Sequence, residues 1–116
     1  VHFSSIEAFN EPSSNWWKAN STQEGCHFDP STQADVVGDL DQLINQQGLD
    51  VDVAASDENT YDQARATWQA FSDETRGLIA KVNVHGYQQG FGRRDLLYND
   101  VIGKRLWNSE YGDSDS

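Results

Sequence analysis

Residues 51–87, VDVAASDENTYDQARATWQAFSDETRGLIAKVNVHGY, contain one complete strand–helix–strand unit as judged from their pattern. One strand is predicted at residues 51–55 and a second at residues 81–84. Between them, apolar side chains recur at steps of three and four, which is the period of an amphipathic helix. Those side chains are Tyr61, Ala64, Trp68 and Phe71. Asn59 or Thr60 is placed to cap this helix. Two strands joined through a helix form a parallel pair with a right-handed crossover.

The same alternation continues on both sides of that unit. Strands are predicted at residues 5–9 and 104–107. One helix begins with Asp29 as its N-cap and Pro30 at its first position, and another runs over residues 93–102. The apolar faces predicted for these two helices comprise Val36, Val37, Leu40, Leu43 and Ile44, and Leu96, Leu97, Val101 and Ile102. The glycines placed to end them are Gly48 and Gly103.

Strands that alternate with helices predict an α/β fold with a parallel sheet. A closed (β/α)8 barrel takes about 250 residues, whereas this chain has 116. We therefore expect residues 1–116 to be a fragment of one such domain, a partial TIM barrel. The inner faces of its strands are expected to carry Ile6, Val53, Val84 and Leu106.

The composition restricts the classes of partner. Eight basic and nineteen acidic residues give a net charge of −11. That charge repels phosphate backbones and anionic lipids, so neither nucleic acid nor membrane is expected as a partner. No clustered Cys and His, no phosphate-binding glycine loop and no nucleophilic serine elbow are evident, so we predict no metal and no cofactor. The single Cys26 cannot form an internal disulfide. The triplet Asn20-Ser21-Thr22 is an acceptor for N-glycosylation and slightly favours secretion.

Two glutamates follow the first and last predicted strands. Glu11 lies within Asn10-Glu11-Pro12, and Glu110 follows residues 104–107. Cleavage of a glycosidic bond needs an acid to protonate the leaving oxygen and a carboxylate to capture the developing oxocarbenium ion. We predict Glu11 as the acid/base and Glu110 as the nucleophile, with their carboxyl groups about 5 to 5.5 Å apart, as in retaining enzymes. The alternative is that both are solvated residues without a catalytic role.

Other side chains near these glutamates are candidates for binding substrate. Asn10 is placed to bond a substrate hydroxyl beside the acid, while His85 and Tyr87 end the strand before the one that bears Glu110. A donor there would favour the charged form of Glu110. Trp16 and Trp17 lie in a long aperiodic loop, and we expect one to be buried and the other to form a platform for a sugar ring.

Three motifs, taken in order, resemble glycoside hydrolase family 30. They are Phe9-Asn10-Glu11-Pro12, Asn83-Val84-His85-Gly86-Tyr87 and Leu106-Trp107-Asn108-Ser109-Glu110-Tyr111-Gly112. The resemblance implies a (β/α)8 catalytic barrel of which this chain covers strands four to seven, with Glu11 as acid/base, Glu110 as nucleophile and Tyr87 as the hydrogen-bond partner of Glu110.

Within that family, one segment is similar to the fungal endo-β-1,6-galactanases. It is Asn10-Glu11-Pro12-Ser13-Ser14-Asn15-Trp16-Trp17-Lys18, followed by Gln23-Glu24-Gly25-Cys26. The resemblance implies a secreted enzyme, monomeric at full length, that hydrolyses the β-1,6-galactan side chains of arabinogalactan with retention of configuration. It also implies that the isolated fragment is inactive. Two alternatives stay open at this point. They are a β-1,6-glucanase of the same family and a non-catalytic carbohydrate-binding protein.

Overall fold

The computed structural model describes residues 1–23 and 25–113, so Glu24 of the quoted segment lies outside the described residues. Four strands are present: β1 (Ser5–Glu7), β2 (Asp52–Glu58), β3 (Ile79–Gly86) and β4 (Arg105–Tyr111). The helices are α1 (Pro30–Gln46), α2 (Tyr61–Ala70), α3 (Asp73–Leu78), α4 (Tyr87–Gly90) and α5 (Arg94–Asp100). In the part of the chain that the structure describes, no helix has the length and apolar character needed to cross a membrane.

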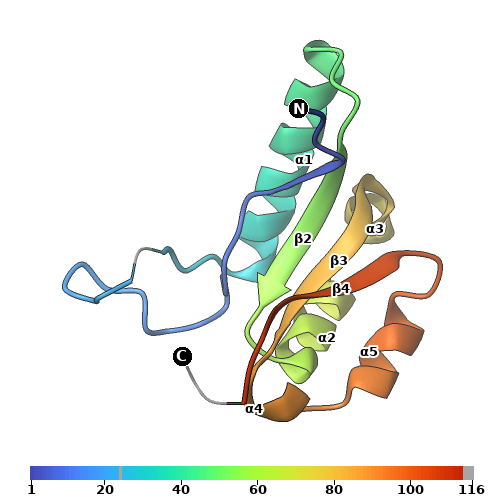
Figure 1. Ribbon diagram of the computed structural model, residues 1–116. Helices are drawn as coiled ribbons and strands as arrows, with labels where there is room; N and C mark the ends of the chain where they lie inside the picture. The colour runs from blue at the N-terminus through green and yellow to red at the C-terminus, as the bar shows by residue number, and fades with distance from the viewer. Residues whose placement is uncertain (24, 114–116) are drawn as a thin grey trace.

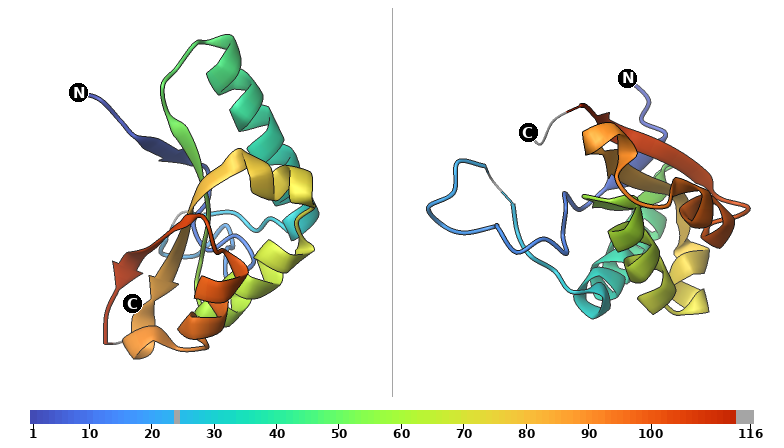
Figure 2. Two further views of the ribbon diagram at one scale, coloured as in Figure 1. Left: turned by 90° about the vertical axis from the view of Figure 1, so that its right-hand side faces the viewer. Right: turned by 90° about the horizontal axis from the view of Figure 1, so that it is seen from below.

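The four strands form one parallel sheet in the order β1-β2-β3-β4. The sheet curls, and helices that connect the strands pack together on one side of it (Figure 1; Figure 2, right). This is the predicted α/β class, and the arrangement is consistent with part of a TIM barrel. The segment between β1 and α1 runs away from the sheet as a long loop (Figure 1).

Local signals in the sequence set the helix boundaries. The carboxylate of Asp29 accepts a hydrogen bond from the Thr32 backbone N–H at 2.9 Å, with Pro30 at the first helical position of α1. Thr60, rather than Asn59, caps α2 through its hydroxyl. Gly48 follows α1 with a φ of 63°, a left-handed conformation that glycine adopts without cost. These caps confirm the predicted helix starts.

The hydrophobic core lies between the sheet and the helices. Val53 and Val84 are buried there, at 3% and 1% exposure, against α1 and α2. The prediction that they belong to the inner face was therefore wrong. The inner face carries polar side chains instead, because the alternation Lys81-Val82-Asn83-Val84-His85 directs every second, polar residue of β3 away from the helices. Leu43 and Ile102, predicted as core, are exposed.

Strands β2, β3 and β4 extend further toward their carboxyl ends than predicted, and register shifts occur there. Ser56 pairs with Asn83 but Glu58 pairs with Val84, so Asp57 is an extra residue in β2. A second shift lies in β4, where Ser109 is the extra residue, since Val84 pairs with Asn108 and His85 with Glu110. A bulge of this kind turns the following side chain to the other face. As a result Glu110 lies opposite His85 on the inner face.

Candidate active site

The buried imidazole of His85 is the centre of the candidate site. It lies on β3, 1% exposed, at the carboxyl end of the inner face. Its Nδ1 lies 2.9 Å from Oε1 of Glu11, and its Nε2 lies 3.7 Å from Oε1 of Glu110. One ring therefore stands between the two carboxylates that come from opposite ends of the chain. The structure brings together the two residues predicted to be catalytic.

A third carboxylate completes the surroundings of His85. Oδ2 of Asp57 lies 3.3 Å from His85 Nε2. Burial opposes a charge on the imidazole, but the adjacent Asp57 carboxylate, followed by Glu11 and Glu110, raises the pKa of His85 to about 9. At neutral pH the ring is therefore a cation, held by the carboxyl groups that surround it. The hydroxyl of Ser109 donates to Asp57, which links the extra residues of the two bulges.

Tyr87 contacts the predicted nucleophile directly. Its hydroxyl donates to Oε2 of Glu110 at 2.6 Å, a short bond of the kind that O–H donors make to carboxylates. The Tyr87 ring also meets His85 edge to face, with ring centroids 5.8 Å apart. Glu110 itself is half exposed, whereas Glu11 is buried. The Tyr87–Glu110 contact that the sequence predicted is thus present.

A second polar pair lies deeper on the inner face. The side-chain amide of Asn83 on β3 donates to Oε2 of Glu7 on β1, while Oε1 of Glu7 is buried without a hydrogen-bond partner among the described residues. Burial, with the neighbouring Asp57 charge as a second cause, raises the pKa of Glu7 to about 8. Glu7 is therefore a neutral acid at pH 7. Our reading of the sequence did not identify this pair, although the polar alternation along β3 was a signal for it.

The remaining predicted binding residues lie on or near the long loop. Asn10 is exposed next to Glu11. Trp16 is 47% exposed, and Trp17 is partly covered and donates its indole N–H to the backbone carbonyl of Glu11 at 2.9 Å. The two rings meet edge to face at 6.3 Å. Trp16 therefore fits the predicted platform better. Trp17 is the more covered of the two, but neither ring is buried, as had been predicted for one of them.

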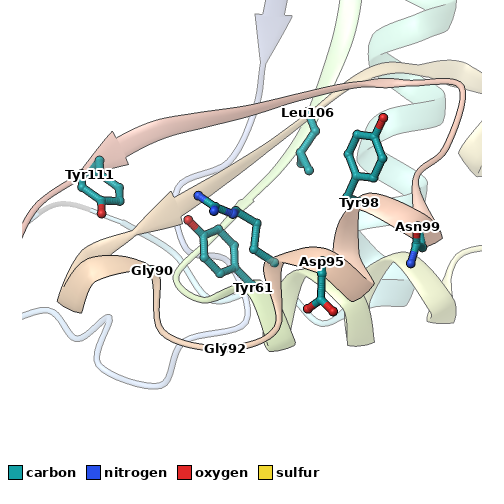
Figure 3. A pocket seen from close by; sticks show the side chains of 9 residues that line it. Tyr61, Gly90, Gly92, Asp95, Tyr98, Asn99, Leu106 and Tyr111 are labelled. Carbon is teal, nitrogen blue, oxygen red and sulfur yellow. The ribbon is translucent and has the colours of Figure 1, made fainter.

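A groove on the other side of β4 holds none of the predicted site residues. It has a volume of about 710 Å³ and is lined by Tyr61, Arg94, Tyr98, Leu106 and Tyr111, among others (Figure 3). Tyr111 follows Glu110 directly, and neighbouring residues of a strand point to opposite faces. The groove thus lies on the helix side. Within residues 1–23 and 25–113, no group of three or more His, Cys, Asp or Glu side chains is arranged to hold a metal ion.

Comparison with known proteins finds a glycosidase among the relatives of this chain. No protein-family model matches the chain. The chain is 60% identical over 118 aligned residues to a curated endo-beta-1,6-galactanase of Hypocrea rufa. The alignment covers all of this chain and 25% of that enzyme, so the chain spans about a quarter of the length of its relative. The resemblance to endo-β-1,6-galactanases predicted from the motifs is confirmed.

Proposed function

We propose that this chain supplies the acid/base and the nucleophile of a retaining endo-β-1,6-galactanase. The observation that carries the proposal is the meeting of Glu11 and Glu110 at one buried imidazole, at 2.9 and 3.7 Å. From the similarity to the Hypocrea rufa enzyme we infer that the substrate is β-1,6-linked galactan, such as that of arabinogalactan. The proposal includes membership of glycoside hydrolase family 30, with β1 to β4 as strands four to seven of its barrel.

The two carboxyl groups divide the reaction between them. Glu11 donates its proton to the glycosidic oxygen as the bond to the anomeric carbon breaks, and Glu110 attacks that carbon to form a glycosyl-enzyme ester. Glu11, now ionised, takes a proton from water, and the water oxygen displaces Glu110 with a second inversion. His85⁺ and the Tyr87 hydroxyl hold Glu110 in place and stabilise its charge when it leaves. Two inversions give net retention.

The assignment of roles is tested in a chimera, in which these 116 residues replace the matching segment of the Hypocrea rufa enzyme. Two substrates are compared: β-1,6-galactan, and the dinitrophenyl glycoside of β-1,6-galactobiose, whose leaving group departs without a proton. Glu110→Gln should abolish turnover of both. Glu11→Gln should reduce kcat/KM on galactan by about 100- to 10,000-fold, the usual contribution of general acid catalysis. On the activated glycoside, kcat/KM should stay near the parent value, because it reports the first displacement, in which that leaving group needs no proton.

Glu74 provides a matched control for both variants. It is an exposed glutamate of α3, remote from the inner face, and Glu74→Gln should hydrolyse both substrates at the parent rate. A Glu11→Gln variant that loses as much activity on the activated glycoside as on galactan, as Glu110→Gln is expected to do, would refute the assignment of roles. An active Glu110→Gln variant would refute the proposed function altogether.

Secretion and a monomeric full-length enzyme are further parts of the proposal. Asn20 of the glycosylation triplet is exposed and lies in a turn closed by the hydrogen bond from Ser21 N–H to the Lys18 carbonyl at 2.9 Å. An exposed turn is accessible to a glycosyltransferase. Production of the chimera in a secreting fungal host should give a protein whose mass falls on treatment with an N-glycosidase. In the Asn20→Gln variant this loss of mass should be smaller by the mass of the glycan on Asn20.

A further inference from the structure

The backbone of Glu11 has a conformation that needs external support. Its φ is 47°, in the left-handed region that residues with a side chain seldom adopt. Such a conformation persists only where its surroundings determine it, and it is common at functional sites. The Glu11 N–H donates to the Asp57 carbonyl at 2.9 Å, which fixes the residue on its N-terminal side. The segment that follows closes a turn in which the Ser14 N–H donates to the Glu11 carbonyl at 3.1 Å, and two further side chains hold it.

Trp17 holds the carbonyl of Glu11. Its indole N–H donates to that oxygen at 2.9 Å, across a separation of six residues. The indole is itself confined, because a Cβ built on Gly25 would lie only 2.5 Å from Cε3 of Trp17. Gly25 therefore lets the far side of the loop close against the ring. The tryptophan thus connects the two sides of the loop to the backbone of the acid/base.

Glu58 holds the chain two residues further on. Its carboxylate accepts from the Ser13 hydroxyl at 2.6 Å and from the Ser13 N–H at 3.2 Å. The same carboxylate accepts from Thr67 of α2 at 2.8 Å and from Gln33 of α1 at 3.3 Å. Glu58 is 1% exposed. It points toward the helices because the bulge at Asp57 turns it away from the inner face.

We propose that Trp17 and Glu58 are positioning residues for the acid/base, acting through the backbone on either side of the Glu11–Ser13 segment. Trp17 fixes the carbonyl of Glu11, and Glu58 ties Ser13 to the two helices behind the sheet. Together they set the direction from which the Glu11 carboxyl group meets the glycosidic oxygen. This inference rests on the role of Glu11 in the proposed function. It predicts that loosening either anchor damages proton donation selectively.

The experiment uses the chimera with Trp17→Phe, which keeps an aromatic ring but removes the N–H, and Ser13→Ala, which removes the hydroxyl bonded to Glu58. Each should lower kcat/KM on β-1,6-galactan by about tenfold or more, since a displacement of about 1 Å in a catalytic group costs about 100-fold. On the dinitrophenyl glycoside, each should lose less than about twofold, because that leaving group needs no proton. Ser13→Thr, which restores a hydroxyl, should recover activity on galactan.

Ser14→Ala is the matched control, since the Ser14 hydroxyl makes no hydrogen bond to the described residues; it should retain the parent rate on both substrates. Equal losses on both substrates for Trp17→Phe and Ser13→Ala would show a general structural role and overturn the inference, as would full activity on galactan. Glu11→Gln, measured alongside, separates the two hypotheses. If it is selective and the loop variants are not, only this inference fails. If Glu11→Gln is itself not selective, the proposed function fails.

Discussion

The neutral state of Glu7 has a measurable consequence for stability. In the unfolded chain this carboxyl has a pKa near 4.5, and in the fold its pKa is about 8. Between these pH values the folded state binds a proton that the unfolded state has lost, so the free energy of unfolding must fall as pH rises. Below pH 4.5 this carboxyl group leaves the free energy of unfolding unchanged, at pH 8 it lowers that free energy by about 4 kcal/mol, and well above pH 8 by the full value of about 5 kcal/mol.

Glu7→Gln tests this reasoning, because a glutamine has the shape of the protonated acid and can accept the same hydrogen bond from the Asn83 amide. The variant has no carboxyl group to ionise at this position. Its free energy of unfolding should therefore exceed that of the parent by an amount that grows from about zero at pH 4.5 to about 4 kcal/mol at pH 8. At about 2 °C per kcal/mol for a large domain, the melting temperatures at pH 8 should differ by about 8 °C.

Scanning calorimetry of the chimera at several pH values between 4.5 and 8 makes the measurement, with Glu74→Gln as the exposed control that follows the parent at every pH. A Glu7→Gln variant whose melting temperature runs parallel to that of the parent across the range would refute the reasoning. It would mean that Glu7 ionises in the fold as it does in the unfolded chain.

Three further predictions concern His85, Tyr87 and the chain alone. The pKa of His85 is raised from 6.5 to about 9, so the protonated ring contributes to the free energy of unfolding fully below pH 6.5, and this contribution is lost as pH rises through 9. Calorimetry of His85→Gln should therefore lack the fall of about 3 kcal/mol that the parent shows over this range. A fall of the same size in the variant would contradict the raised pKa of His85. Tyr87→Phe should lower kcat on galactan by about 10- to 100-fold through loss of its bond to Glu110, whereas Tyr98→Phe, on an exposed ring of α5, should not; equal rates for the two would show that the bond is dispensable. The 116 residues produced alone should self-associate and be inactive, because β1 and β4 are edge strands of the described sheet; size-exclusion chromatography that finds a compact monomer with galactanase activity would prove this wrong.

Local signals account for much of what the sequence predicted. Asp29 and Pro30 define the start of α1, and Thr60 the start of α2, because the caps depend on a few neighbouring residues. The placement of Glu11 and Glu110 at the same edge of the sheet was predicted from their positions near the carboxyl ends of the first and last strands. These features depend on chain order and short-range chemistry, which a single sequence contains.

The two bulges could not be predicted in the same way. An extra residue at Asp57 or Ser109 changes the pairing register without disturbing any periodicity in the sequence. Without the shift at Ser109, Glu110 would pair with Gly86 and point toward the helices. The orientation of Glu110 therefore depends on a long-range pairing. The side of the sheet on which Val53 and Val84 lie was mispredicted for a related reason, since apolar strand residues alone do not show which face the helices cover.

The most direct test of the central claim is to trap the glycosyl-enzyme intermediate. A 2-deoxy-2-fluoro derivative of β-1,6-galactobiose with a dinitrophenyl leaving group should react with the chimera but hydrolyse slowly, because the fluorine destabilises both oxocarbenium-like transition states. Mass spectrometry of the digested protein should then find the sugar on the peptide that contains Glu110, linked to that carboxylate. A label on Glu11 instead, or no label together with a product of inverted configuration, would contradict the account.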